Sequence, residues 1–386
     1  MSRLSICLVG LDNLPVLAPE FRAQAVGGES VQQTLLARAL VRRGHQVSMV
    51  TADCGQHDAM VRDGICVYKA YRPAAGIPLL RFIHPRWSGL WSALARADAQ
   101  LYYTSCAGMH VGLLALFCAR HGRRFIFRCA SDTDCDPARL LVRYARDRWL
   151  YAYGLRRAHA ILVQSAAQAH SLAQRFGLTS RVAGMLAEPA PPAARRDVDV
   201  LWTGNIRRVK RPERVLELAA GLRYATIHMV GGPVPDEQGL YQQIRAAAER
   251  HPNVLFHGHL PYWEARAMYG RARLLINTSD AEGFPNAYLQ AWMLGVPVVT
   301  FSDPDGVIDC HGLGEVVRSP LAMAAAVRRL LGDPDELAAL GARCRAYMRQ
   351  EYAGERILAP YLAAFEELLR GPADARQLIA GGGPRV

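Results

Sequence analysis

The stretch Asn277–Thr300, NTSDAEGFPNAYLQAWMLGVPVVT, decides the fold. Apolar runs of strand length overlap its two ends, ARLLIN at 272–277 and PVVTF at 297–301. Between them, residues 287–294 carry apolar side chains at helical spacing, and Gly295 is a helix stop. The pattern predicts strand, loop, helix and strand. In open parallel α/β sheets, ligands bind at the carboxyl ends of the strands, so the loop is the first candidate site.

The loop at 280–286, DAEGFPN, has the composition of a ligand-binding turn. Gly283 allows close approach to the backbone, and Pro285 suits the first position of a helix. The amides of that first turn would hold an anion. Glu282 adds a carboxylate beside the same opening. This combination suits a ligand that carries both hydroxyls and phosphate.

EGFPNAYLQAW, residues 282–292, resembles the signature of the retaining GT-B glycosyltransferases of family 4, in which seven residues separate two glutamates. Glu282 matches the first glutamate, and Gln290 stands where the second is expected. The resemblance implies that Glu282 lies near the transferred sugar and that Gln290 faces the ribose, to which an amide still hydrogen-bonds without charge. It also implies that the donor is bound by the loop residues Gly283, Phe284, Pro285 and Asn286.

Chain length, composition, net charge and cysteine count limit the possible classes of protein. A chain of 386 residues with 51% hydrophobic residues can supply two domain cores. The formal charge of +12 suits phosphorylated substrates, an anionic membrane or nucleic acid, and only Lys69 and Lys210 are lysines. No apolar run approaches the roughly 20 residues of a membrane span, and we interpret SRLSICLVGLDN as a buried strand instead of a signal peptide. Nine cysteines without a C-x-x-C pair predict reduced thiols in a cytoplasmic protein, without zinc.

The first half alternates strands and helices. SICLVG, a long loop, a helix that ends at Gly44 and the strand VSMVT form a βαβ unit. The loop contains Gly27 and Gly28, which the resemblance assigns to the phosphates of the donor; a tight turn before the helix is the alternative. The turn lacks G-x-G-x-x-G, which argues against a nicotinamide-dependent dehydrogenase.

The domain organisation follows from this alternation. The fold class is α/β, and the resemblance implies GT-B, with two Rossmann-like domains facing each other across a cleft. We expect the acceptor domain at 1–187, a proline-rich linker at 188–197 and the donor domain at 198–351. A helix at 352–370 resembles the terminal helix that crosses back to the first domain, and 371–386 is expected to be a mobile tail.

A cationic loop follows the strand DVLWTG. Residues 204–212, GNIRRVKRP, place four cations within five positions, which suits a diphosphate. In the resembled family this loop reads glycine, arginine, hydrophobe, three residues and lysine. Gly204 and Lys210 fit, Asn205 replaces the arginine, and Arg207 could supply the missing charge. A solvated charged face is the alternative.

The segment 257–270, HGHLPYWEARAMYG, resembles the turn that packs on the nucleobase, through Leu260 and Tyr262. Ordinary packing at a helix start explains them equally well. His257 and His259 lack an acidic partner for metal ligation. The family commonly needs no metal, so we expect no cofactor and only a nucleotide-diphosphate sugar as co-substrate.

The acceptor side is expected in the first half. The loops YYTSCAGMHVG and RCASDTDCDP follow strands, and the resemblance makes His110 and Asp132 the acceptor-side candidates. The alternatives are a helix-start role for His110 and capping or turn formation for Asp132 and Asp134.

Two segments, 77–96 and 138–157, mix arginine with aromatic residues. They suit peripheral contact with an anionic membrane; packed helices with a basic exposed face are the alternative. Neither belongs to a nucleic-acid-binding motif, so nucleic acid is not an expected partner.

The resemblance therefore predicts a cytoplasmic, nucleotide-sugar-dependent, retaining glycosyltransferase of hexosyltransferase type, in part on the inner face of the membrane. Its catalytic residues would be Glu282, Lys210 and Arg207, with Lys210 and Arg207 stabilising the leaving diphosphate. The acceptor would be a saccharide or lipid-linked, in the assembly of cell-surface polysaccharide or glycolipid. A GT-B nucleotide-sugar epimerase and a non-catalytic nucleotide-sugar-binding subunit are the alternatives.

Overall fold

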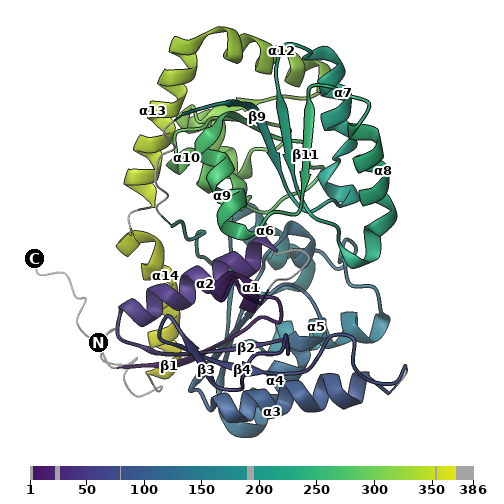
Figure 1. The fold of residues 1–386 in the computed structure, drawn as a ribbon. Helices are drawn as coiled ribbons and strands as arrows, with labels where there is room; N and C mark the ends of the chain where they lie inside the picture. The colour runs from purple at the N-terminus through teal and green to yellow at the C-terminus, as the bar shows by residue number, and fades with distance from the viewer. Residues whose placement is uncertain (1–2, 22–26, 79, 189–194, 353, 371–386) are drawn as a thin grey trace, which may run out of the picture. The chain divides into compact units, whose positions relative to one another are not determined.

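The computed structural model describes residues 3–21, 27–78, 80–188, 195–352 and 354–370. By their contacts, these residues divide into two units (Figure 1). The first unit comprises 1–17, 33–184 and 355–386, and the second comprises 18–32 and 185–354. The residues 189–194 of the expected linker and the expected tail at 371–386 lie outside the described residues.

The first unit is built on an eight-stranded sheet of order β3-β4-β2-β1-β5-β6-β7-β8. All neighbouring strands are parallel except the edge pair β3 and β4. The central strands are buried on both faces, as in a sheet covered by helices on two sides. The strands are β1 (Ser5–Val9), β2 (Gln46–Thr51), β3 (Met60–Arg62), β4 (Ile65–Lys69), β5 (Leu101–Ser105), β6 (Arg124–Arg128), β7 (Ala160–Val163) and β8 (Arg181–Val182).

The helices of this unit connect successive strands, and its last helix comes from the end of the chain. Tyr103 on β5 packs edge-on against Phe365 of that last helix at 6.2 Å between ring centroids. The helices are α1 (Leu14–Leu17), α2 (Gly28–Arg42, which begins in the second unit), η1 (Phe82–Trp87), α3 (Ser88–Ala97), α4 (Met109–His121), η2 (Asp132–Cys135), α5 (Ala145–Arg157), α6 (Ala166–Phe176) and α14 (Gly354–Leu369).

The second unit is a six-stranded parallel sheet of order β11-β10-β9-β12-β13-β14. Its strands are β9 (Val198–Thr203), β10 (Ile227–Val230), β11 (Val254–Gly258), β12 (Ala272–Asn277), β13 (Val298–Thr300) and β14 (Gly314–Val316). Its helices are η3 (Arg208–Lys210), α7 (Glu213–Gly221), η4 (Pro235–Glu237), α8 (Gln238–Ala248), α9 (Tyr262–Arg271), α10 (Asn286–Met293), η5 (Pro304–Gly306), α11 (Val307–His311), α12 (Pro320–Gly332) and α13 (Pro334–Glu351).

Two apolar clusters cover the two faces of this second sheet. Trp202 of β9 packs in one cluster with helices α7, α8 and α12, whereas the adjacent Leu201 packs in the other with α9, α10 and α13. Successive side chains of a strand point to opposite faces, so β9 joins both cores. In Figure 1, α7 and α8 accordingly lie on one side of the sheet and α9, α10 and α13 on the other.

The predicted α/β class is confirmed, and each strand expected from an apolar run is present. The structure adds β3, β8 and β14, which have three, two and three residues. These strands are too short to give an alternating or continuous apolar pattern, which explains why the sequence does not reveal them. Within the described residues, no helix is both long and apolar enough to cross a membrane.

Candidate functional site

The cationic loop, residues 204–212, follows β9, and backbone hydrogen bonds fix its first residues. The amide of Gly204 donates to the carbonyl of Val230 at 3.0 Å, and the amide of Ile206 donates to that of Gly232 at 2.9 Å. The Ile206 side chain is fully buried. The fixed loop then forms the short helix η3, which ends at Lys210.

The end of β12 and the start of the following loop carry three buried polar residues, Asn277, Thr278 and Ser279. The amide of Ser279 donates to Oδ1 of Asn277 at 2.9 Å, which closes a tight turn directly after the strand. Buried polar side chains need partners, and these side chains find theirs in the neighbouring loop and at Glu282.

Thr278 ties the two loops together. Its hydroxyl donates to the carbonyl of Lys210 at 2.8 Å and accepts from Nε1 of Trp202 at 2.9 Å. The amide of Asp280 donates to the carbonyl of Val209 at 2.9 Å. The backbone around Lys210 is therefore fixed relative to the loop that carries Glu282.

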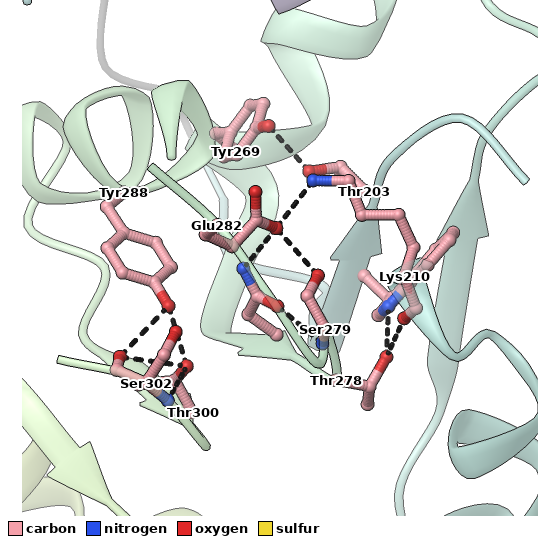
Figure 2. A network of polar contacts seen from close by, with 11 residues as sticks. Thr203, Lys210, Tyr269, Thr278, Ser279, Glu282, Tyr288, Thr300 and Ser302 are labelled. Carbon is pink, nitrogen blue, oxygen red and sulfur yellow. Dashed lines mark hydrogen bonds and ion pairs between the residues drawn. The ribbon is translucent and has the colours of Figure 1, made fainter. Parts of the chain in front are cut away.

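Three donors converge on one oxygen of Glu282 (Figure 2). Oε1 accepts from Nζ of Lys210 at 2.5 Å, from Oγ of Ser279 at 2.6 Å and from Nδ2 of Asn277 at 3.2 Å. The Glu282 side chain is only 11% exposed, and that of Lys210 is 27% exposed. Oε2 has no partner among the described residues, so one carboxylate oxygen is held and the other is available to a ligand.

The ion pair between Lys210 and Glu282 places both signs of charge at the site. The nearly buried carboxylate of Glu282 is contacted by one cation and by two neutral donors. A diphosphate would attract the Lys210 ammonium as strongly as the carboxylate does. Ligand binding at this position is therefore coupled to the environment of Glu282.

The other cations of the loop differ from one another. Arg211 pairs with Glu213 at 2.5 Å and with Asp280 at 3.1 Å. Arg207 is exposed, and within the described chain its guanidinium has no ion-pair partner. Of the charges expected near a diphosphate, Arg207 is therefore available, whereas Arg211 is already used to hold the two loops.

Asn205, the departure from the resembled pattern, is half-buried beside Gly204. A Cβ on Gly231, at the end of the neighbouring strand β10, would collide with the Gly204 carbonyl, so the two backbones meet at a glycine. The base of the loop is consequently tight.

The helix α10 begins at Asn286 behind this site, with Pro285 as its N-cap residue. The OH of Tyr288 lies 2.6 Å from Oγ1 of Thr300, which anchors the helix to β13 (Figure 2). Phe284 is 9% exposed, and its ring packs edge-on against Trp292 at 6.1 Å. Phe284 can therefore offer a ligand its backbone and not its ring.

The glycine pair adjoins the start of α10 within the second unit. Gly28 begins α2, and a Cβ there would collide with the Asn286 side chain. One turn later, Nε2 of Gln32 donates to Oδ1 of Asn286 at 2.6 Å. The predicted Gly28 and Asn286 thus lie together, and Gln32 is an addition that the sequence pattern does not single out.

The predicted base turn surrounds the start of α9. Tyr262 begins the helix and is half-buried, and Leu260 packs against the cluster beneath α9 and α10. The OH of Tyr269 lies 2.6 Å from Oγ1 of Thr203, at the end of β9, and burial raises the pKa of Tyr269. Gln290, the position expected at the ribose, is half-buried on α10.

A cavity of about 380 Å³ borders the loop beyond Asp280. Arg214 bonds the Thr278 carbonyl at 2.9 Å and Asp280 at 2.8 Å, and its guanidinium carbon lies 5.0 Å from the centroid of the Phe301 ring. The cavity is lined by Arg214, Ser279, Asp280, Phe301, Ser302, Val317, Arg318 and Pro320. Ser279 therefore borders this cavity and also bonds Glu282.

The first-unit candidates occupy two adjoining loops. His110 is the second residue of α4, and its Nε2 lies 3.1 Å from the carbonyl of Ser105; burial lowers its pKa. Asp132 begins η2 and accepts from Nε2 of Gln168 at 3.0 Å. The amide of Ala107 donates to Asp134 at 3.4 Å, which joins the loops that carry His110 and Asp132.

Asp134 has the capping role that the sequence offers as an alternative. Together with Ser131 it forms a capping box at the start of η2, and it accepts from the amides of Ala130 at 2.9 Å and Ser131 at 3.2 Å. Asp134 is 6% exposed. Asp132 is the more accessible of the two carboxylates.

The two histidines of 257–259 lie at the end of β11. Nε2 of His257 lies 3.0 Å from Nδ1 of His228 on β10, and burial lowers the pKa of both rings. The pairing of β10 with β11 is irregular at this point, between Met229 and Val230. Among the described residues, no group of three potential ligands could hold a metal ion.

Asn277, Thr278 and Ser279 belong to the candidate site by their contacts, and the sequence analysis does not single them out. The sequence contains a signal for them, since three consecutive polar residues begin at the last residue of the buried strand β12. Such a triplet at the carboxyl end of a parallel strand favours a ligand site over a simple turn.

Two protein families match this chain. The family described as Glycosyltransferase Family 4 matches residues 26–183, and that described as Glycosyl transferases group 1 matches residues 197–333. No curated protein matches the sequence.

Several solved structures share the fold. A sucrose-phosphate synthase from Thermosynechococcus elongatus has a TM-score of 0.77 at 18% identity, with 95% of this chain and 99% of that chain covered. HepE from Anabaena, solved with UDP and glucose, has a TM-score of 0.71 at 14% sequence identity. The match covers 95% of this chain and 100% of HepE. A glycosyltransferase from Rickettsia africae has a TM-score of 0.67 at 12% sequence identity. The match covers 96% of this chain and 100% of that chain.

Proposed function

The chain is a GT-B glycosyltransferase that combines a family 4 domain with a group 1 domain, and we propose that it transfers a sugar from a nucleoside-diphosphate sugar to a saccharide or lipid-linked acceptor. The observation that carries the proposal is the convergence of Lys210, Ser279 and Asn277 on one oxygen of Glu282. The arrangement leaves the second carboxylate oxygen of Glu282 available, in the loop that precedes α10. HepE, which shares the fold, is described with UDP and glucose bound.

In the proposed reaction, different residues stabilise the negative charge of the diphosphate and the positive character of the sugar ring. As the bond between the anomeric carbon and the phosphate oxygen breaks, negative charge grows on the diphosphate and positive character on the sugar ring. Lys210 and Arg207 would stabilise the diphosphate, together with the first amides of α10. The free oxygen of Glu282 would orient sugar hydroxyls and favour the positive ring.

The proposal includes retention of anomeric configuration. In a front-face reaction, the leaving phosphate can take the acceptor proton, so no separate base is required. The half-buried His110 and Asp132 are proposed to bind the acceptor and not to remove its proton. A product of inverted configuration would contradict this part.

The donor test uses nucleotide binding first. Thermal stabilisation is measured with UDP, GDP, ADP, dTDP, CMP, NAD and NADP, with and without magnesium. A ligand that binds the folded state alone adds about 2.7 kcal/mol of stability at 100-fold excess over its Kd. We expect a selective shift with one nucleoside diphosphate, and the matching sugar nucleotide then serves as donor.

The two lysines give a matched comparison for that test. Lys210→Met should remove most of the shift with the nucleoside diphosphate, whereas Lys69→Met changes the other lysine, on β4 of the first unit, and should leave it intact. Absence of a shift with every nucleotide, or an equal effect of both variants, would contradict the assigned donor site.

One alternative has specific support. Gln290 and Asn205 depart from the family pattern, which favours a subunit that binds a nucleotide sugar without turning it over. Selective nucleotide binding without release of nucleoside diphosphate, over a panel of saccharide and lipid-linked acceptors, would favour that reading. Conversion of the sugar nucleotide without an acceptor would favour the epimerase.

We also propose that the acceptor belongs to cell-surface polysaccharide or glycolipid assembly, on the cytoplasmic side of a membrane. The support is the basic charge of +12 and the two segments that mix arginine with aromatic residues. A protein that modifies lipid-linked saccharides must reach the bilayer surface where the acceptor lies.

A further inference from the structure

One region of the first unit gathers large hydrophobic side chains at the surface. Twelve such side chains are exposed among the described residues, and six of them lie in the two segments 77–83 and 141–149. Their exposed fractions run from 49% to 70%. Scattered exposed hydrophobics need no explanation, but a cluster of this kind marks an interaction surface. The six are Ile77, Leu80, Ile83, Leu141, Tyr144 and Trp149.

A contact between the two segments makes them one surface. The guanidinium carbon of Arg146 on α5 lies 3.6 Å from the centroid of the Phe82 ring in η1. The same guanidinium lies 6.0 Å from the Tyr144 ring. Residues 64 positions apart in the sequence therefore share a surface, which we call the arginine–aromatic surface and define as residues 77–78, 80–87 and 139–157.

The outward face of α5 extends this surface. Leu150, Tyr151 and Leu155 on the opposite face are buried in the core of the unit. Trp149 is 64% exposed and stacks on Tyr153 at 5.5 Å. The core is thus complete without Trp149, so its exposure is not explained by packing within the described unit.

The charge of the surface is nearly all of one sign. Its two segments contain eight arginines and a single acid, Asp147, which pairs with Arg146 at 2.7 Å. Seven of the arginines are exposed. The eight are Arg81, Arg86, Arg139, Arg143, Arg146, Arg148, Arg156 and Arg157.

We propose that the arginine–aromatic surface docks on a bilayer that contains anionic phospholipid. Arginines interspersed with Trp, Tyr, Leu and Ile match both parts of such a surface, since the cations meet phosphate groups and the apolar side chains enter the region below them. A protein partner or a second copy would need a complementary acidic and apolar face, and nucleic acid would leave Leu141 and Ile83 without apolar contact.

The docking assigns a surface to the membrane location included in the proposed function, and its test does not require sugar transfer. Each arginine near an anionic bilayer strengthens binding by about fivefold, and added salt weakens this effect. The surface belongs entirely to the first unit, whereas Glu282 and Lys210 lie in the second. Vesicle binding and nucleotide binding can therefore be measured separately on the same full-length variants.

The test is co-sedimentation of the full chain with vesicles of phosphatidylcholine alone or with about one third phosphatidylglycerol. We expect binding only to the anionic vesicles, and loss of that binding at high salt. Two double variants probe the surface: Leu141→Ser with Trp149→Ser, and Arg143→Gln with Arg148→Gln. Each should weaken vesicle binding at least tenfold without changing the nucleotide-induced thermal shift.

Matched controls change equally exposed side chains elsewhere. Trp263 and Leu321 are 45% and 82% exposed in the second unit, and their double serine variant should bind vesicles as the wild type does. The exposed Arg223 and Arg250 give the corresponding glutamine control.

Four results would overturn the proposal: wild-type protein that stays in the supernatant with anionic vesicles at low salt, surface variants that bind vesicles normally, a dimer in solution that the surface variants disrupt, or tight RNA binding that they abolish. Failure of nucleotide binding alongside normal vesicle binding would contradict the proposed donor site and would leave the membrane proposal unaffected.

Discussion

Replacing Glu282 by glutamine removes one charge and keeps the shape of the side chain. In the wild type, three donors meet at Oε1: the Lys210 ammonium at 2.5 Å, the Ser279 hydroxyl at 2.6 Å and the Asn277 amide at 3.2 Å. The amide oxygen of glutamine can accept from the same donors. The variant therefore tests the charge and not the packing.

The structure sets the size of the expected loss of stability. A hydrogen bond to a charged group contributes about 1.5–3 kcal/mol, against about 1 kcal/mol between neutral groups. The Lys210 side chain is 27% exposed, so solvent screens part of the difference. We expect the free energy of unfolding to fall by about 1–2 kcal/mol, which corresponds to a decrease of about 2–8 °C in Tm for a unit of this size.

The expected loss of catalysis is larger. Removal of one electrostatic group from a transition state typically costs about 100- to 1,000-fold in rate, and we expect a fall of this order for Glu282→Gln. The assay is release of nucleoside diphosphate from the donor identified by thermal shift, at saturating donor and below the Tm of the variant. Ser279→Ala is the control, because it removes one donor from Oε1 and keeps the carboxylate charge. It should lower stability by about 1.5–3 kcal/mol, because the lost hydrogen bond ends on a charged group, and it should lower the rate far less than Glu282→Gln does.

Either of two outcomes would refute this reasoning. Turnover of Glu282→Gln close to that of the wild type would remove Glu282 from the catalytic assignment. Equal rate losses in Glu282→Gln and Ser279→Ala would show that the carboxylate acts only by holding the loop.

Three further predictions concern other groups. Lys210→Met should weaken nucleoside diphosphate binding by about 10- to 100-fold and reduce its salt dependence, with nucleoside binding unchanged in calorimetry; equal losses for both ligands would contradict a phosphate role. Gln290→Glu should retain turnover, because it restores the common residue of the resembled family, and loss of donor binding would show a site rebuilt around the amide. Burial lowers the pKa of His228 and His257 below 6.5 in the folded state. As the pH drops below 6.5, the histidines of the unfolded state are therefore protonated before those of the folded state, and the free energy of unfolding falls. Thermal melts between pH 7.5 and 5 should show this fall, with a smaller slope for His257→Gln; an unchanged slope would assign it to other histidines.

Apolar runs are sufficient to predict the longer strands of the two sheets. Runs such as ARLLIN are strongly apolar and bounded by polar residues, so their strands can be predicted without tertiary information. The short β14 is different, because Gly314, Glu315 and Val316 become a strand only by pairing with β13. Its conformation depends on neighbours that a local pattern does not contain.

The candidate site can also be predicted from the sequence only in part. Lys210 and Glu282 are found from their loops, but their mutual contact depends on the parallel neighbours β9 and β12, which are far apart in the sequence. Thr278 and Ser279 look like ordinary turn residues until their partners are known. The Phe284 ring, counted within the donor loop by its position, packs in the core instead.

The last helix, α14, has a consequence for the order in which the chain folds during synthesis. The OH of Tyr361 donates to the carbonyl of Gly184 at 2.8 Å, so the points where the chain leaves and re-enters the first unit are neighbours. Phe365, fully buried in that unit, is translated after the whole second unit. The nascent chain can therefore complete its second unit first, and the first unit waits on the ribosome with part of its core unfilled.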